Sequence, residues 1–368
     1  MKKTKMARKI IFVCISKALL IGILVLLLLV YPTAKLLMGG SDNIFSQKFF
    51  GKKANYQGII RLWNIDSFEG GSLPKSSFLE KLSMKFEKQN KGVFIKVENL
   101  SEDEVVASLK MGIYPDLVSF GTGMQKYFEG KFLSVDDSVG MNLMQNFYSA
   151  GLKEGSLKAV AYMSGLYCLI STTDRIENAG KSAETSLSTL AFALAQDIQL
   201  KKQTKHIHSL TFGKNAYTSA FDAFSRKFPG SSVHELASSL VIDQAFNSQT
   251  PYDAYEKFVT NKSNMLLGSQ RDVFRMENRV RAGKESNVIY EPIQEYTDLV
   301  QYLSILSTDK NIYNVCMDFI KFVLLPQNQS ELSNIGMFSV CSQEIYDKEP
   351  YANLQNAFKD NMIVKNLF

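Results

Sequence analysis

Strand and helix patterns alternate early in this chain, and this alternation constrains the fold more than any other feature of the sequence. Gly58–Trp63 is a short apolar run typical of a buried strand, and Val93–Val97 alternates between apolar and polar residues like a second strand. Between them, Ser77 and Glu80 form a capping-box pattern that predicts the start of a helix. The order strand, helix, strand favours an α/β fold.

The alternation continues beyond the second strand. Glu102–Met111 predicts a helix that Gly112 closes, and Leu117–Phe120 predicts a third strand. Strands that alternate with helices along a chain usually lie in one parallel or mixed sheet, with the helices covering its faces. We therefore expect a parallel or mixed sheet here.

The later part of the chain carries fewer clear strands. The middle segment, 171–270, is richer in helix-forming residues and serine. After it, Val288–Ile293 and Asp298–Leu306 are predicted to be strands, and Tyr313–Leu324 is predicted to be an amphipathic helix. A last amphipathic run extends from Glu344 to Phe368.

The strand ends indicate where a ligand would bind. In open α/β sheets, ligands lie at the carboxyl ends of the strands. Three places meet this condition: the loop after Trp63, the loop after Phe120 and the segment that begins at Gly268. We expect a binding site where these three places meet.

The positive charge of the chain is concentrated at its N-terminus. The formal net charge is +6, from 42 basic and 36 acidic residues among 368. Residues 1–40 hold seven of the basic residues and none of the acidic ones, so residues 41–368 carry a net charge of −1. A nearly neutral folded part argues against nucleic-acid binding.

The N-terminus has the pattern of a secretion signal or a signal anchor. Basic residues precede Ile10–Val30, a run that is almost wholly apolar and about as long as the 20 residues a membrane-spanning helix needs. We expect an uncleaved anchor, because Pro32 lies where signal cleavage requires a small residue; a cleaved signal peptide is the alternative. The basic flank predicts that the rest of the chain lies outside the cell membrane.

The four cysteines suggest no zinc or redox site. Cys14 lies in the apolar run, and Cys168, Cys316 and Cys341 are too widely spaced for either. We expect buried apolar cysteines, with a disulfide between Cys316 and Cys341 as the alternative.

The sequence contains no catalytic or metal-binding constellation. It lacks the nucleophile-elbow, phosphate-loop and zinc-protease motifs. His206 and His208 share a face if they lie in a strand, as two metal ligands must, but no third ligand is spaced near them. We expect neither an enzyme nor a cofactor or metal.

Several segments, taken in their order, carry a family resemblance. They are the strand and tryptophan loop at Arg61–Ser72, the proline-aspartate strand at Tyr114–Phe120, the crossing segment at Ala161–Ile170, the return passage at Gly268–Ile305 and the turn at Ile335–Val340. This order resembles the bacterial extracytoplasmic solute-binding proteins of ABC importers, the family of maltose-binding protein. The resemblance runs over most of residues 57–345.

The resemblance implies a two-lobed α/β fold of the periplasmic-binding-protein type, with a ligand cleft between the lobes and hinge crossovers. The domain boundaries that it implies are 1–40 for the anchor or signal peptide, 41–56 for a linker, 57–163 for lobe one, 164–293 for lobe two, 294–335 for the return to lobe one and 336–368 for a C-terminal segment on lobe two.

The resemblance also implies a function. Such a protein would be a monomer that captures a small, carbohydrate-like solute by lobe closure and delivers it to the transmembrane subunits of an ABC permease. The alternative is a membrane-anchored sensor or interaction protein that has the same fold without transport.

The resemblance and the strand ends together predict ten ligand-contacting residues. They are Trp63, Asp66, Glu69, Ser119, Phe120, Tyr162, Tyr167, Arg271, Tyr296 and Asp298. The indole of Trp63 suits stacking on a sugar ring, and a guanidinium suits hydroxyls or a carboxylate. For Trp63 the alternative is packing in the core, and for Arg271 it is an ion pair with a neighbouring carboxylate.

Overall fold

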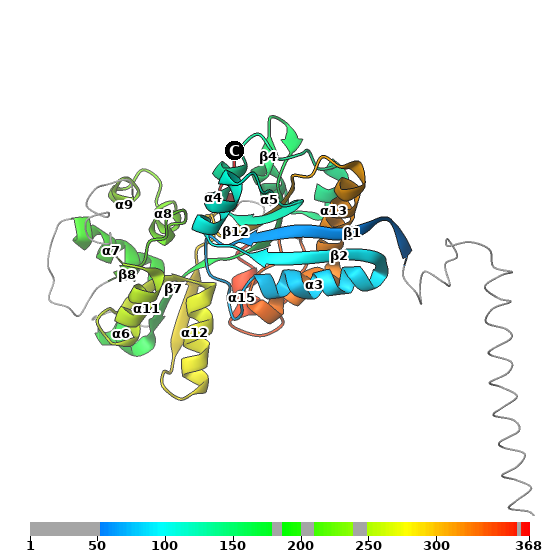
Figure 1. Cartoon of the computed structure of the whole chain (residues 1–368). Coiled ribbons are helices and arrows are strands. Elements are labelled where there is room, and N and C mark those ends of the chain that lie inside the picture. Colours follow the sequence, from blue (N-terminus) through cyan, green and yellow to red (C-terminus); the bar gives the residue numbers. More distant parts are fainter. Residues whose placement is uncertain (1–51, 179–185, 200–209, 238–248, 359–361) are drawn as a thin grey trace, which may run out of the picture. The chain divides into compact units, whose positions relative to one another are not determined.

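The structure is a computed structural model that describes residues 52–178, 186–199, 210–237, 249–358 and 362–368 (Figure 1). The N-terminal apolar run, His206 and His208 lie outside these residues. By its contacts the chain divides into two units, residues 1–54 with 88–92 and residues 55–87 with 93–368. Within the described ranges, no helix has the length and apolar character needed to cross a membrane.

A five-stranded sheet combines strands that are far apart in the sequence. Its order is β2-β1-β3-β12-β6, and the strands are β1 (Lys52–Ile65), β2 (Asn90–Asn99), β3 (Leu117–Gly121), β6 (Val160–Ser164) and β12 (Val300–Ile305). Strands β1 and β3 are parallel, whereas β12 is antiparallel to both β3 and β6. The mixed sheet expected from the sequence is confirmed.

Helix α3 (Ser76–Gln89) packs one apolar face into the core. Its Phe86 contacts Phe319 and Phe322 of α13 (Lys310–Val323) edge to face, with ring centroids 5.3 and 5.5 Å apart. The predicted capping box at Ser77 is wrong. The helix begins at Ser76, shortly after Pro74, so Ser77 already lies in its first turn.

Helix α4 (Glu102–Lys110) follows the sequence prediction closely. Ser101 and Glu104 form a capping box at its start, and Gly112, with φ of +73°, follows its C-cap. Strand β3 begins soon afterwards, and all five of its residues are buried. The alternation of strands and helices therefore holds through the first three strands.

A second sheet has four strands in the order β10-β7-β9-β8. They are β7 (Tyr167–Thr172), β8 (Leu210–Phe212), β9 (Met265–Ser269) and β10 (Val288–Pro292). Strands β8 and β9 are parallel, and β7 is antiparallel to β9 and β10. The accompanying helices are α6 (Thr173–Asn178), α7 (Leu187–Gln199), α8 (Ala220–Ser225), α9 (Ser232–Leu236), α11 (Pro251–Val259) and α12 (Gln270–Arg281).

The chain passes between the two sheets by short segments. Gly165 and Leu166 join β6 to β7, and the return runs from β10 to β12 through β11 (Tyr296–Thr297). Because both sheets belong to one contact unit, the lobe boundaries at 163 and 293 stay predictions.

The segment between β3 and β6 holds only short elements. They are η1 (Met124–Phe128), η2 (Asp137–Asn142), α5 (Gln145–Ala150), β4 (Leu152–Lys153) and β5 (Ser156–Leu157).

The C-terminal part is also made of short elements. They are α14 (Pro326–Gln329), η3 (Ser330–Ile335), α15 (Tyr351–Gln355) and β13 (Ile363–Val364), which pairs with β11. Leu354 and Met362 join a core with Phe258 of α11, and the amide of Leu367 donates to the carbonyl of Ala150 in α5. The amphipathic run after Glu344 thus contains one short helix and one short strand.

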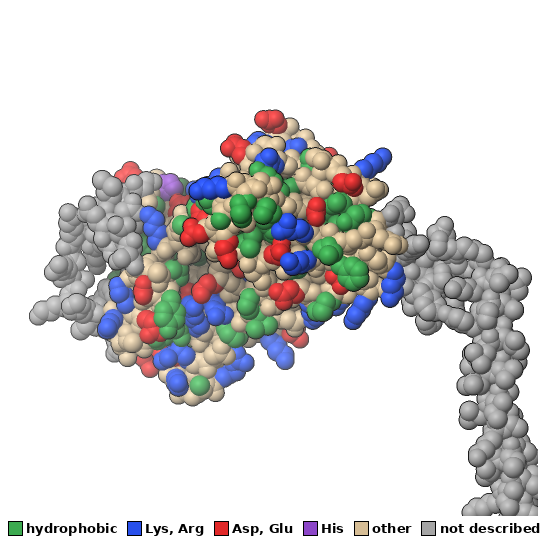
Figure 2. Space-filling view, viewed as in Figure 1, with side chains coloured by type: hydrophobic (Ala, Val, Ile, Leu, Met, Phe, Trp, Pro, Cys, Tyr) green, Lys and Arg blue, Asp and Glu red, His purple; other side chains and the backbone are tan. Residues whose placement is uncertain are grey.

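The described cysteines are all buried thiols. Cys168, Cys316 and Cys341 are free, so no Cys316–Cys341 disulfide is present and the expectation of apolar cysteines is confirmed for these three. On the face shown in Figure 2, basic and acidic side chains are interspersed without a single-sign field, in keeping with the near-neutral charge after residue 40.

Candidate functional site

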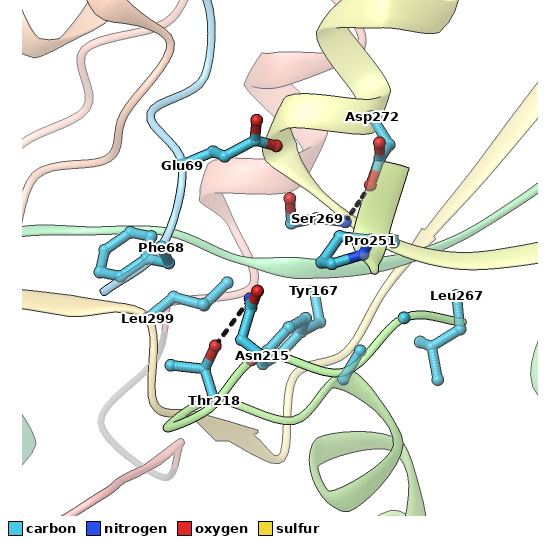
Figure 3. A pocket seen from close by; sticks show the side chains of 13 residues that line it. Phe68, Glu69, Tyr167, Asn215, Thr218, Pro251, Leu267, Ser269, Asp272 and Leu299 are labelled. Atoms are coloured by element: carbon cyan, nitrogen blue, oxygen red, sulfur yellow. Dashed lines mark hydrogen bonds between the residues drawn. The ribbon is translucent and has the colours of Figure 1, made fainter. Parts of the chain in front are cut away.

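A pocket of about 40 Å³ lies where strand ends of the two sheets meet (Figure 3). From the first sheet come Phe68 and Glu69, in the loop that follows β1. From the second come the loop after β8, with Asn215 and Thr218, and the junction of β9 with α12, with Asp272. Two of the three predicted places, the loop after Trp63 and the segment at Gly268, therefore contribute to one pocket.

The pocket lining combines polar, aromatic and acidic side chains. The Asn215 amide donates to the Thr218 hydroxyl over 3.0 Å, and both groups keep further hydrogen-bonding capacity. Phe68 and Tyr167 supply aromatic surface. A volume of about 40 Å³ has room for only a few water molecules.

Asp272 anchors the start of α12 beside the pocket. Its carboxylate accepts a hydrogen bond from the Ser269 amide over 3.0 Å, completing a capping box, and pairs with Arg275 at 2.9 Å. The side chain is buried, and this burial raises its pKa despite those partners. Asp272 is thereby committed to holding the helix in place.

The first turns of α12 bind the loop after β1 directly. Arg271 donates to the carbonyls of Gly71 and Ser72, at 2.7 and 3.2 Å, and Gln270 donates to the carbonyl of Glu69 at 3.1 Å. Arg275 pairs with the Glu69 carboxylate at 3.2 Å. The predicted ligand arginine therefore holds main-chain carbonyls, and the ion pair expected for Arg271 belongs to Arg275.

A second set of contacts, which we call the clasp, consists of Glu102, Lys126 and Tyr217. The Tyr217 hydroxyl donates to Glu102, and the Lys126 ammonium donates to the Tyr217 hydroxyl over 2.7 Å. The Tyr217 ring also lies against Gly123, where an added Cβ would fall 2.3 Å from it. Tyr217 comes from the loop after β8, whereas the other residues flank β3, so the clasp also joins the two sheets' loops.

The crossing segments meet at Asp298. Its carboxylate accepts hydrogen bonds from the Tyr167 hydroxyl at 2.6 Å and from the Ser219 amide at 3.1 Å. Burial raises the pKa of Asp298 to about 6. Tyr296 is buried nearby, with the Arg226 guanidinium 4.2 Å from its ring centroid.

Four predicted site residues lie inside the first sheet and do not line the pocket. Trp63 is 1% exposed, and its indole N–H donates to Glu98 at 3.1 Å. Ser119 donates to Asn64 at 2.8 Å and lies 2.8 Å from the hydroxyl of Tyr162. Phe120 stacks on Phe132, 5.3 Å between centroids. The ligand role of these four stays a prediction.

The sequence reasoning missed part of the pocket and the side chain that lies behind it. Asn215 and Thr218 follow β8, a three-residue strand with too little periodicity to mark its end. Lys75 is fully buried next to Asp66 and Gln301, although a lysine before a helix ordinarily predicts a solvated side chain. In the described part of the chain, no group of three His, Cys, Asp or Glu residues could hold a metal ion.

Comparison with known proteins identifies the fold. No family model and no curated protein sequence matches this chain. Solved structures do match over most of its length, and they include a receptor solved with acarbose, a sugar-binding protein and an ABC substrate-binding protein. The chain therefore has the two-lobed α/β fold of these solute-binding proteins.

Three of these structures illustrate the match. The GacH receptor of Streptomyces glaucescens, solved unliganded and with acarbose, is 15% identical with a TM-score of 0.57, covering 84% of this chain and 88% of its own. The sugar-binding protein MalE of Xanthomonas citri is 15% identical with a TM-score of 0.58, covering 84% and 86%. An ABC substrate-binding protein of Listeria monocytogenes in complex with cycloalternan is 12% identical with a TM-score of 0.56, covering 85% and 89%. Nothing in these comparisons favours the sensor alternative.

Proposed function

We propose that this chain is the extracytoplasmic substrate-binding component of an ABC importer, which captures a carbohydrate-like solute and delivers it to a membrane permease. The observation that carries the proposal is the pocket at the strand ends of both sheets, in a fold whose solved representatives include receptors bound to acarbose and cycloalternan. The residues around the pocket bind and orient; no reacting group is required of them.

The pocket chemistry supports a neutral, polyhydroxylated solute. Amide and hydroxyl groups at Asn215, Thr218 and Ser269 suit hydroxyl partners, and the rings of Phe68 and Tyr167 suit the apolar faces of a sugar. The nearby guanidinium groups of Arg271 and Arg275 already donate to protein oxygens. A carboxylate or phosphate ligand would therefore find no free cation among them.

The size of the pocket implies that the solute enters a more open state. Sites for small molecules commonly measure about 300–1,000 Å³, whereas this pocket measures about 40 Å³. The contacts of α12 and of the clasp would have to loosen before a sugar unit fits. The solute would then stabilise a closed state by contacts to the loops of both sheets.

The ten site residues predicted from the sequence differ in how close they lie to the pocket. We propose that Glu69 and Tyr167 contact the solute directly, because both line the pocket. Asp298 lies one interaction from the pocket lining, through Tyr167, whereas Asp66 and Arg271 contact Lys75 and Gly71, which do not line the pocket themselves. These three would act mainly by fixing the residues that contact the solute.

The N-terminal segment would tether the protein to the outer face of the cell membrane. The apolar run with its basic flank supports this placement. A tether keeps a monomeric binding protein close to its permease and raises its effective concentration there.

Thermal unfolding of the full chain in detergent tests the proposed function. The panel contains acarbose, mannobiose, β-D-galactopyranose, polyols, amino acids and short peptides. A ligand that binds only the native state stabilises it by about 2.7 kcal/mol at a hundredfold excess over Kd. We expect the melting temperature to rise with carbohydrates and with no other class in the panel. We expect Asn215→Ala to make this rise smaller. A folded sample that responds to no member, or to amino acids or peptides only, contradicts the proposal.

A further inference from the structure

A lysine is fully buried directly behind the pocket. Lys75, just before α3, is 0% exposed. Its ammonium donates to the side-chain oxygen of Gln301 at 3.0 Å, lies 3.4 Å from the Asp66 carboxylate, and lies 3.4 Å from the centroid of the Phe68 ring. The ammonium is thus held by a hydrogen bond, an ion pair and an aromatic ring.

Stability does not explain why a cation occupies this position. Burial lowers the pKa of Lys75 to about 8, although Asp66 acts in the opposite direction. Between about pH 8 and 10.5 the unfolded chain binds more protons than the folded one, so stability rises with pH in that window. Below about pH 8 the cost of burying the charge is present in full. The Asp66 side chain is 41% exposed, so an apolar residue in place of Lys75 would leave that carboxylate in contact with water rather than buried and unpaired.

The partners of Lys75 do explain the cation, because they carry the pocket. Phe68 lines the pocket with its ring above the ammonium, and Glu69 follows it in the same loop. The loop is also tight at Gly70, where an added Cβ would lie 2.3 Å from the Leu73 carbonyl oxygen and in van der Waals contact with the Lys75 stem. The Lys75 side chain thus contacts the loop after β1 at both Phe68 and Gly70.

Gln301 extends this support to the centre of the sheet. Because its side-chain oxygen accepts from Lys75, its amide nitrogen points toward the Ile65 carbonyl and the Ser119 hydroxyl, at 3.2 and 3.1 Å. The ammonium therefore joins the end of β1 to β12.

We propose that Lys75 is the positioning residue of the ligand pocket: its buried ammonium holds the Phe68 ring and the Asp66 carboxylate so that Phe68 and Glu69 face the solute. The inference rests on the proposed function for the identity of the ligand. The effect of Lys75 on the loop is testable without any ligand.

The test compares Lys75→Met with Lys85→Met in the full chain in detergent. Lys85 lies in α3, which Lys75 directly precedes, pairs with Glu331 at 2.7 Å and does not line the pocket, so its variant controls for the loss of one lysine. Hydrogen exchange is followed at the amides of residues 69–73, and Kd is measured for acarbose and mannobiose. We expect Lys75→Met to raise exchange at these amides and Kd at least tenfold, with a melting temperature at pH 7 no lower than that of Lys85→Met.

A double-mutant cycle with Phe68→Leu separates positioning from general damage. If Lys75 acts through the Phe68 ring, adding Lys75→Met to Phe68→Leu weakens binding no further. Additive losses, or unchanged exchange and unchanged Kd in Lys75→Met, overturn the proposal. If the wild type binds neither sugar, the proposed function loses its support, and the exchange result alone decides the role of Lys75.

A pH series on the wild type keeps the test decisive if Lys75→Met does not fold. The charged group that faces the ammonium is Asp66, since Gln301 and Phe68 are neutral and the pKa of Tyr162 is raised. Above about pH 8 the lysine loses its proton, so exchange at residues 69–73 should rise relative to amides of α13. A constant ratio from pH 6.5 to 9.5 would overturn the proposal.

Discussion

Single side chains at the crossings between the sheets carry charge in places where water is excluded. Asp298 is 1% exposed and has a pKa raised to about 6 by burial. Its two hydrogen bonds, from Tyr167 and the amide of Ser219, compensate only part of the desolvation of the carboxylate. The residue therefore links the folding equilibrium to pH.

The first prediction concerns this linkage. A carboxyl whose pKa is raised in the folded state adds stability that is complete below its unfolded pKa, near 4, and is lost as pH rises through about 6. The loss should amount to about 1–3 kcal/mol, and Asp298→Asn should abolish it. Urea unfolding from pH 4 to 7 measures the slope. Asp318→Asn, on an exposed face of α13, is the control and should keep the wild-type slope.

Trp63 gives a second prediction at this scale. It is the only tryptophan in the chain, is 1% exposed, and contacts Phe128 edge to face at 6.5 Å. Trp63→Ala should destabilise the fold by about 3–5 kcal/mol because it leaves a cavity in the core and removes the indole hydrogen bond to Glu98. Chemical unfolding measures the loss. The wild-type tryptophan emission should also be blue-shifted and insensitive to added sugar; a red shift on binding would show that the indole reaches the solute.

At the scale of elements, the sequence predicted the periodic segments well, and two of the ten predicted site residues, Glu69 and Tyr167, line the pocket. Helix α4 and strand β3 were predictable because a capping box, a closing glycine and an apolar run mark them. Which face of the sheet lies toward the pocket was not predictable from the sequence. Every residue of β3 is buried, so no alternation distinguishes one face from the other.

The lack of a face signal also explains why Trp63 was predicted to contact the ligand. A strand end identifies the edge of the sheet where ligands bind, but successive side chains point to opposite faces. The pocket instead receives Phe68 and Glu69 from the loop farther on. Their placement depends on Lys75, which no sequence pattern marks, and on α12, which lies about 200 residues farther along the chain.

A third prediction compares two glycines, Gly112 after α4 and Gly123 before η1. Gly112 and Gly123 have φ of +73° and +95°, but only Gly123 is covered, by the Tyr217 ring. Alanine at either position should cost about 1–2 kcal/mol for the left-handed backbone. Gly123→Ala should in addition displace Tyr217 and raise hydrogen exchange in residues 213–218. Equal exchange in the two variants would contradict the role of the clasp.

For the whole molecule, the central question is how often the pocket opens. Two groups of contacts restrain it, the bonds of Arg271 and Arg275 to the loop after β1 and the clasp. A binding-competent state that is populated for a fraction of the time lowers the apparent affinity by that fraction.

The fourth prediction follows from these restraints. Combining Arg271→Ala with Tyr217→Phe should raise the association rate constant for the best-binding sugar of the panel several-fold, because the pocket is open more of the time. The dissociation rate constant should also rise, because the closed complex loses the same contacts. Stopped-flow fluorescence with an external dye measures both. Tyr148→Phe, which removes a hydroxyl bonded to Asp137 outside the pocket, should change neither.

The three buried thiols have a practical consequence. Cys168 lies in β7 of the second sheet, Cys316 in α13 beside the first, and Cys341 at the edge of the C-terminal segment. A thiol is alkylated only when its surroundings open, and its peptide mass identifies it. A timed pulse of alkylating reagent on the unaltered protein would therefore record the order in which these three regions come apart. The chain carries its own set of unfolding reporters.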